Sequence, residues 1–355
     1  MKWFYLPCSL IFSLLLFSCS KTGNTVSPIK KDTTSSTTSN AGTTTNTGNT
    51  GTTTNTGNTG TTTSTTTTCN ATVADAENIE IFPADNSWNQ DISGAPVDPY
   101  SSQIIATFST APLKAEFGSG LWNNVPMGDP FIVVCGSQPK VKVTFRANSY
   151  DANYGNLSFP GPYPIPANAP IENNGQDDAH VIVVDKDNGL LYELYNASVS
   201  NGQWSASSGG VFNLKSDSLG NGGADASGLP IFPGLVRYDE VLKGTIDHAL
   251  RFTLAPAHVK PGFVAPARNS ATSSTGGQYA LPYGAKIRLK ASFDISGYPA
   301  DLQVILKAMK KYGLILADLG ADMYVTGAPD PRWNNAELHQ LGNIPASNFE
   351  VVKFE

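Results

Sequence analysis

The sequence Ala179-His-Val-Ile-Val-Val-Asp185, followed by Lys-Asp-Asn-Gly and then Leu190-Leu-Tyr-Glu-Leu-Tyr195, decides the fold class that we expect. Two apolar runs flank an Asn-Gly dipeptide, which is the strongest short signal for a β-hairpin. The stretch from Asp185 also resembles the start of an EF-hand loop. Its glycine comes one position early and no glutamate stands at the twelfth position, so we interpret it as a hairpin turn.

Strand pairing across this turn predicts which side chains share a face of the hairpin. If the turn is centred between positions 187 and 188, His180 faces Tyr195, and alternation puts both on one face with Glu193. His180 and Glu193 are then diagonal neighbours, near Asp178 in sequence. A carboxylate raises the pKa of a nearby imidazole and partial burial raises that of a carboxyl group, which indicates an acid/base pair. An exposed polar face on an edge hairpin is the alternative.

Other short segments alternate in the same way or are bounded by glycine and proline. They cover residues 131–135, 141–145, 246–254, 286–290, 314–318 and 323–326. Many short strands favour one mainly β domain of the sandwich or jelly-roll type. A single amphipathic helix is expected over residues 299–312, with Leu302, Ile305 and Met309 on its apolar face and Gly313 ending it. The sequence contains no repeating βαβ pattern, so we do not expect a doubly wound fold.

Residues 1–18 have the pattern of a bacterial lipoprotein signal peptide. An early lysine precedes an apolar run, and Leu16-Phe-Ser-Cys19 resembles the lipobox, whose cysteine is acylated. The apolar run is shorter than a membrane-spanning helix requires. We therefore expect acyl chains on Cys19 to anchor the protein to a membrane of the bacterial cell envelope. A signal peptide cut elsewhere, or an uncleaved anchor, is the alternative.

A polar segment follows the expected lipidation site. Residues 19–70 are rich in Thr, Asn, Gly and Ser and include a nine-residue repeat at 42–50 and 51–59. With almost no large apolar side chains to bury, such a segment cannot offset its backbone entropy, so we expect a disordered tether. The composition changes near residue 71, and we expect residues 71–355 to form a single globular domain.

Cysteine usage and charge limit the possible partners. With Cys8 removed and Cys19 acylated, Cys69 and Cys135 remain, and an oxidising compartment favours a disulfide between them over two free thiols. No Cys-x-x-Cys motif or Cys/His cluster is present, so the sequence predicts no metal site and no cofactor. The formal charge is −6. Because nucleic-acid binding needs a cationic surface, that partner is not expected.

Three further segments carry candidate catalytic residues, although no nucleophile elbow, metalloprotease, phosphate-loop or dinucleotide motif occurs. Asp225 lies in a glycine-rich loop at 220–228, where it is either a site residue or part of a plain connection. His248 and Arg251 point to opposite faces of one strand, so at most one of them shares a site with the hairpin. Arg237 is a further candidate.

Two aspartate-containing turns near the C-terminus have alternative interpretations. Asp318 and Asp322 flank a glycine turn and are candidates for a cation site or an acid/base pair. Asp330 and Arg332 favour a packed turn with an internal ion pair.

Four tryptophans are candidates for sugar stacking, with core packing as the alternative. They are Trp88, Trp122, Trp204 and Trp333.

Several segments together resemble a group of secreted bacterial proteins that has no established activity. They are Ile81-Phe-Pro-Ala-Asp-Asn-Ser-Trp-Asn89, Pro160-Gly-Pro-Tyr-Pro-Ile-Pro166, Gly234-Leu-Val-Arg-Tyr-Asp-Glu-Val241, His248-Ala-Leu-Arg-Phe252 and Gly327-Ala-Pro-Asp-Pro-Arg-Trp333. The resemblance spans most of residues 79–352. It implies that this region is one domain, and it implies neither a mechanism nor catalytic residues.

These observations lead to the hypothesis of a polysaccharide-active enzyme. In a glycoside hydrolase, Glu193 and Asp225 would be the acid and the base or nucleophile. In a polysaccharide lyase, His180 or Tyr195 would abstract a proton, and Arg237 or Arg251 would neutralise the uronate. The alternatives are a non-catalytic carbohydrate-binding or adhesion module and a structural envelope lipoprotein.

Overall fold

The computed structural model describes residues 71–146 and 158–354, which belong to one compact unit, Thr65–Glu355. The predicted signal peptide, Cys19, the tether and Cys69 lie outside the described residues. Cys135 is disulfide-bonded. Because the other three cysteines all lie outside the described residues, its pairing with Cys69 stays a prediction. Within residues 71–146 and 158–354, no helix is long and apolar enough to cross a membrane.

The mainly β class is confirmed, and each segment predicted as a strand contains one. The finer prediction of a sandwich or jelly roll is not confirmed. Both larger sheets contain parallel pairs, such as β4 with β6 and β12 with β16, whereas a jelly roll is built from antiparallel strands.

The predicted hairpin forms the middle of a five-stranded sheet, which we call the hairpin sheet. Its strand order is β11-β10-β7-β6-β4, and β4 pairs with β6 in parallel. The strands are β4 Phe131–Val134, β6 Val181–Asp185, β7 Leu190–Tyr195, β10 Ser208–Asn213 and β11 Asn221–Gly222.

The turn between β6 and β7 has the predicted centre. Ile182 pairs with Glu193 and Asp185 with Leu190. The Asp185 carboxylate accepts hydrogen bonds from the backbone and side-chain nitrogens of Asn188, at 3.1 and 2.7 Å. Gly189 adopts the left-handed conformation that closes the turn, with φ 64°.

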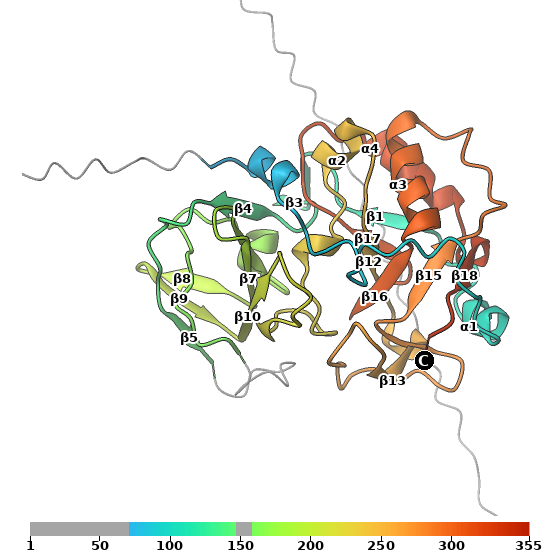
Figure 1. The fold of residues 1–355 in the computed structure, drawn as a ribbon, viewed down its shortest axis with the longest axis horizontal. Helices are drawn as coiled ribbons and strands as arrows, with labels where there is room; N and C mark the ends of the chain where they lie inside the picture. Colours follow the sequence, from blue (N-terminus) through green and yellow to red (C-terminus); the bar gives the residue numbers. More distant parts are fainter. Residues whose placement is uncertain (1–70, 147–157, 355) are drawn as a thin grey trace, which may run out of the picture. The chain divides into compact units, whose positions relative to one another are not determined.

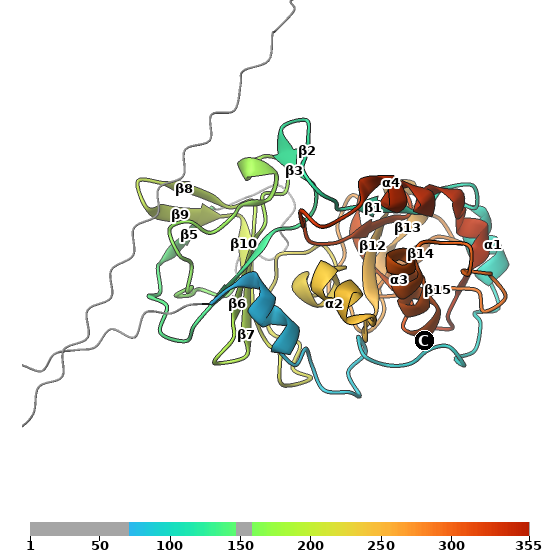
Figure 2. The ribbon, with the colours of Figure 1, turned by 90° about the horizontal axis from the view of Figure 1, so that it is seen from above.

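The second large sheet has six strands in the order β1-β17-β12-β16-β15-β18, with parallel and antiparallel pairs. They are β1 Lys114–Glu116, β12 Leu250–Leu254, β15 Lys286–Leu289, β16 Leu314–Leu319, β17 Tyr324–Thr326 and β18 Phe349–Val351. Figures 1 and 2 both show this sheet, mainly orange to red, beside the hairpin sheet, which is green to yellow.

Three small sheets complete the strands of the described residues. They comprise β2 Leu121–Trp122 with β3 Val125–Pro126, β13 Val259–Phe263 with β14 Leu281–Tyr283, and the order β5 Val143–Phe145, β9 Gln203–Ala206 and β8 Ser198–Ser200. Short helices connect the strands. They are α1 Ser101–Ala106, α2 Tyr238–Lys243, α4 Asn335–Leu338, η1 Val73–Asn78, η2 Glu172–Gly175, η3 Phe232–Gly234, η4 Pro256–His258, η5 His339–Asn343 and η6 Ala346–Asn348.

The predicted helix is α3, Ala300–Lys311, and it contacts β15 of the six-stranded sheet. Its buried residues include Leu302, Ile305 and Met309, as the apolar spacing predicted. Pro299 occupies the N-cap position, so the first residue of the helix is Ala300. Gly313 follows in the left-handed conformation, with φ 77°.

Two hydrophobic clusters lie on opposite faces of the β6–β7 hairpin. Val181, Val183, Tyr192 and Leu194 belong to the smaller cluster, as strand alternation predicted. The other face, with Ile182 and partly buried Tyr195, joins the large cluster that also contains the six-stranded sheet. Polar residues on that face, including His180 and Glu193, are therefore enclosed and do not form an exposed edge.

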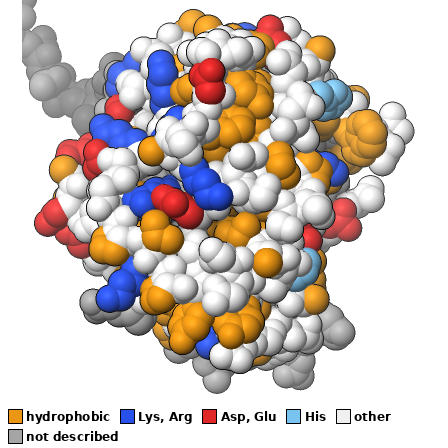
Figure 3. All heavy atoms as spheres, turned by 90° about the vertical axis from the view of Figure 1, so that its right-hand side faces the viewer, with side chains coloured by type: hydrophobic (Ala, Val, Ile, Leu, Met, Phe, Trp, Pro, Cys, Tyr) orange, Lys and Arg blue, Asp and Glu red, His pale blue; other side chains and the backbone are white. Residues whose placement is uncertain are grey.

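The surface in Figure 3 mixes residue types. Lysine and arginine side chains on this face are scattered among acidic and hydrophobic ones. This distribution agrees with the acidic formal charge of −6.

Candidate functional site

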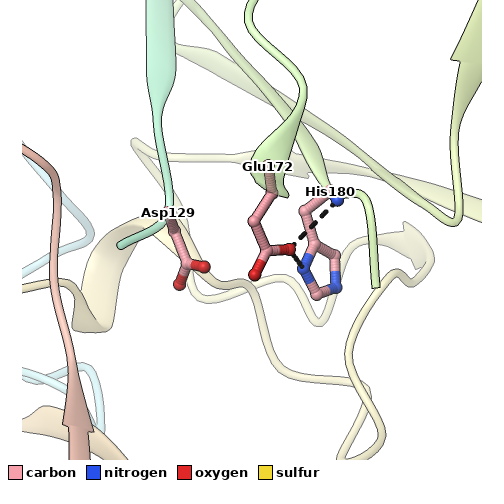
Figure 4. Close-up of side chains that lie close together, drawn as sticks. All are labelled: Asp129, Glu172 and His180. Carbon is pink, nitrogen blue, oxygen red and sulfur yellow. Dashed lines mark hydrogen bonds and ion pairs between the residues drawn. The ribbon is translucent and has the colours of Figure 1, made fainter. Parts of the chain in front are cut away.

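His180 immediately precedes β6, and its ring is held between two hydrogen-bond partners. Its Nδ1 lies 2.6 Å from Glu172 Oε2, and its Nε2 lies 3.1 Å from the carbonyl oxygen of Ala224. Figure 4 shows Glu172 between His180 and Asp129. The predicted acid/base pair of His180 with Glu193 is therefore wrong, because the carboxylate bonded to this imidazole belongs to Glu172.

Glu193 lies on the predicted face but has a different role. Its carboxylate accepts hydrogen bonds from the backbone nitrogens of Ile231, at 2.9 and 3.0 Å, and Phe232, at 2.9 Å. These N–H groups open the short helix η3 and have no partner within it. Glu193 is fully buried, and burial raises its pKa to about 7 against the lowering effect of these bonds. We therefore assign Glu193 a structural role instead of a catalytic one.

Arg251 of β12 joins three carboxylates from separate parts of the chain. Its Nη2 pairs with Asp225 and lies 3.8 Å from Asp318 Oδ2, and its Nη1 lies 3.4 Å from Asp129 Oδ2. Asp225 also accepts hydrogen bonds from the backbone and hydroxyl of Ser227, both at 3.0 Å. The glycine-rich loop is thus part of the site, as the sequence suggested for Asp225.

Carboxyl groups outnumber cations in this region. Burial and the neighbouring Asp225 raise the pKa of Asp318 well above its usual value, although Arg251 acts in the opposite direction. Burial and the neighbouring Glu172 likewise raise the pKa of Asp129 well above its usual value. Burial alone would lower the pKa of His180, but Glu172 raises it to about 10.

The glycine-rich loop and the hairpin face enclose a cavity of about 140 Å³. Its polar lining comes mainly from Asp178, Tyr195, Ser208, Asp225 and Asp318. Asp178 is exposed and Asp318 is partly exposed, whereas Asp225 is buried. The buried hydroxyl of Ser208 has no hydrogen-bond partner among the residues that the structure describes. This cavity therefore offers two reachable carboxyl groups and an unused hydroxyl group.

Arg237 and His248 lie in a separate cluster. Glu240 Oε1 lies 2.6 Å from Arg237 Nη2 and 3.2 Å from His248 Nε2. Burial alone would raise the pKa of Glu240, but these two partners hold it below its usual value. The three residues line a larger cavity of about 380 Å³. Because Glu240 is already paired with both, we regard this cluster as an ion-pair network. His248 and Arg251 lie in different clusters, but strand alternation does not separate them, because β12 begins at Leu250 and His248 precedes it.

The four tryptophans do not form a common surface. Trp88, Trp204 and Trp333 are buried in the hydrophobic clusters, so they present no face to a sugar ring. Trp122, in the β2–β3 ribbon, is 68% exposed.

The turns predicted near the C-terminus have separate roles. Asp318 and Asp322 do not form a pair, because Asp322 Oδ1 binds His258 Nδ1 at 2.8 Å while Asp318 approaches Arg251. Asp330 and Arg332 form the predicted internal ion pair, at 2.7 Å.

Sequence reasoning missed Asp129 and Glu172. In the parallel register of β4 and β6, Phe131 pairs with Ile182, so Asp129 and His180 each stand two residues before paired positions. The pairing of β4 with β6 brings Asp129 close to His180, and no local sequence pattern predicts this pairing. Glu172 lies eight residues before His180, in η2, where its backbone nitrogen donates to the His180 carbonyl oxygen at 3.0 Å.

Comparison with protein-family models, with curated proteins and with solved structures finds no match for this chain.

Proposed function

We propose that this domain cleaves glycosidic bonds by acid/base catalysis in the cavity lined by Asp178, Asp225 and Asp318. The observation that carries the proposal is Asp318, a partly exposed carboxyl group in that cavity whose pKa is raised by burial and by Asp225. A general acid must keep its proton near neutral pH until it donates it to the leaving oxygen. The raised pKa of Asp318 favours this role.

The other cavity residues supply the remaining parts of the mechanism. Glycoside hydrolysis needs a second carboxylate, to activate water or to attack the sugar. Asp178 takes this role because it is exposed at the cavity, where burial raises the pKa of Asp178 and the His180 imidazole acts in the opposite direction. Asp225 is buried and bound to Arg251 and Ser227, so it positions the site.

The charge of the cavity favours a hydrolase over a lyase. A lyase needs a free cation to neutralise the uronate carboxylate of its substrate. Arg251 already contacts Asp129, Asp225 and Asp318, and Arg237 is paired with Glu240 elsewhere. An anionic sugar would meet further carboxylates here. The proposed substrate is therefore a neutral polysaccharide.

Full-length protein and a panel of neutral and uronic polysaccharides test this proposal. We expect reducing ends to appear from a neutral substrate, and Asp318→Asn to slow their release by about 100-fold or more. Asp322→Asn is the matched control, because Asp322 binds His258 away from the cavity. Equal rates in the two variants would remove Asp318 from the mechanism. An unsaturated product absorbing in the ultraviolet would indicate a lyase.

A non-catalytic glycan-binding function is the second candidate, and the exposed ribbon β2–β3 favours it. The side chains of Leu121 and Trp122 are 64% and 68% exposed there. A tryptophan face stacks on sugar rings. If this ribbon alone binds glycan, Trp122→Ala abolishes retention on a polysaccharide column while Asp318→Asn leaves it unchanged.

We also propose that the domain works at the bacterial cell envelope. The lipobox-like sequence at Cys19 and the polar segment to residue 70 support a lipid anchor with a flexible tether. Such a tether would let the domain reach polysaccharide near the membrane while it stays attached.

A further inference from the structure

The ring of His180 is oriented as a metal ligand would be. Its Nε2 lies 3.1 Å from the carbonyl oxygen of Ala224, which can only accept a hydrogen bond, so Nε2 carries the proton. Nδ1 then faces the carboxylates. Histidines that bind metals commonly donate their second N–H to a backbone carbonyl, which fixes the tautomer. Ala224 lies outside the carboxylate cluster, so this contact is independent of it.

Two carboxylates lie near this ring, and Glu172 contacts its Nδ1 directly. One ligand atom each from Asp129, Glu172 and His180 lies within 4.8 Å of the other two. Figure 4 shows the Asp129 and Glu172 carboxyl groups side by side, next to the imidazole. Both carboxylates come from backbone that is held in place. The backbone nitrogen of Asp129 donates to Gly327 and that of Glu172 to His180, at 2.9 and 3.0 Å.

We propose that Asp129, Glu172 and His180 bind one divalent transition-metal ion of the Zn²⁺ type. One imidazole nitrogen and two carboxylate oxygens are a ligand set that zinc accepts, with a fourth position left for water. Calcium prefers six to eight oxygen ligands, so it fits this set poorly. On binding, the Nδ1–H bond that points to Glu172 breaks, its proton leaves for solvent, and the freed Nδ1 lone pair binds the ion.

The surroundings of the three ligands support this proposal. Arg251 Nη1 lies 3.4 Å from Asp129 Oδ2, and hydrogen bonds to a ligating carboxylate are typical of metal sites. The Nε of Arg251 is buried and has no hydrogen-bond partner in the part of the chain that the structure describes.

The site goes beyond the proposed hydrolase chemistry. Arg251 links Asp129 to Asp225, so the ion would lie one side chain away from the catalytic cavity without touching Asp318. The role of the ion would be to hold the side chains of Glu172 and His180 in place next to the β6–β7 hairpin. The sequence predicted no metal site because Asp129, Glu172 and His180 are not arranged in a recognised motif.

Calorimetric titration of Zn²⁺ into the full-length protein, stripped of metal with a chelator, tests the site. We expect one ion per chain, and a visible absorption spectrum of tetrahedral geometry when Co²⁺ is used instead. His180→Gln and Glu172→Gln should each weaken Zn²⁺ binding by about 100-fold or more. His258→Gln is the matched control, because His258 forms a separate pair with Asp322.

Three outcomes separate this proposal from the hydrolase proposal. Absence of stoichiometric Zn²⁺ binding, or equal binding by wild type and a folded His180→Gln or Glu172→Gln variant, overturns the metal site. Folding of each variant is checked by circular dichroism, and Glu172, at 16% exposure, tolerates substitution better than His180.

Asp318→Asn should keep the ion even where it abolishes cleavage. A wild-type protein that binds Zn²⁺ but cleaves no glycan overturns only the hydrolase.

Discussion

Arg251 is the residue on which the candidate site depends most. It is 3% exposed and contacts carboxylates from the loop before β4, the glycine-rich loop and β16. Removing one partner from a buried ion pair leaves an uncompensated charge, which costs about 3–5 kcal/mol. We therefore expect Arg251→Leu to lower the free energy of unfolding by about this amount in urea denaturation.

Arg332→Leu is the control for this substitution. The Arg332 side chain is 43% exposed and pairs with Asp330 and Asp239 at the surface. Exposed pairs contribute about 0–1 kcal/mol, so this variant should lose little stability. Similar losses in the two variants would show that the buried cluster is not held together by Arg251.

Glu193 should make the stability of the protein depend on pH. Burial raises its pKa from 4.5 to about 7. The folded state then holds this proton more tightly than the unfolded chain, so stability is lost as pH rises from 4.5 through about 7. Each unit corresponds to about 1.4 kcal/mol, so Glu193→Gln should reduce the loss over this range by up to roughly 3 kcal/mol. Urea denaturation at both ends of the range measures it, and an unchanged pH dependence would contradict the assigned burial.

Strand β11, within the glycine-rich loop, requires glycine at position 222. Gly222 has φ 77°, and a Cβ atom there would lie 2.1 Å from the Gly209 carbonyl oxygen. Gly202 has a similar φ of 73°, but a Cβ atom there would meet nothing within 4 Å. Comparing alanine at the two positions separates backbone strain from lack of space.

We expect Gly202→Ala to cost about 1–2 kcal/mol, from the left-handed backbone alone. Gly222→Ala should cost clearly more, because β11 must move away from β10 and shift the adjoining Asp225 loop. Thermal unfolding of both variants compares the costs. A Gly222→Ala variant no less stable than Gly202→Ala would mean that the approach of β10 and β11 is looser than described.

At the level of elements, the hairpin could be predicted and its partners could not. The register of β6 with β7 follows from a four-residue turn and from alternation, both of which are local. The parallel pairing of β4 with β6 joins residues about 50 positions apart, and no local pattern specifies it. That pairing brings Asp129 to His180, so the carboxylates around the imidazole were mostly missed.

For the whole molecule, the many short alternating segments predicted the mainly β class, and alternation within the hairpin predicted its apolar faces. The arrangement of the sheets depends on contacts between distant segments, and the jelly-roll prediction was not confirmed for this reason. Of the residues predicted from the sequence, Asp225 and Tyr195 line the smaller cavity, Arg251 pairs with Asp225, and His180 pairs with Glu172. Arg237 and His248 belong to a different cluster, because their positions follow from how the turn at η3 and α2 packs.

The proposed attachment to the membrane depends on Cys19, which lies outside the described residues. If Cys19 is acylated, Cys19→Ala should move the protein from the membrane fraction to the soluble fraction of a bacterial host, because the acyl chains provide its membrane affinity. Cell fractionation and immunoblotting measure this change, with Cys135→Ala as the control. A Cys19→Ala protein that stays with the membrane would contradict the lipid anchor.

The most direct test of the proposed catalytic site is the titration of Asp318 itself, which needs no knowledge of the substrate. Carbon-13 NMR of the aspartate carboxyl groups follows this titration in the full-length protein, and Asp318→Asn identifies the signal. We predict that Asp318 stays protonated well above the ordinary aspartate value of 3.8, because it is desolvated and lies near Asp225. A midpoint at the ordinary value would show that Asp318 is not the acid for glycosidic cleavage.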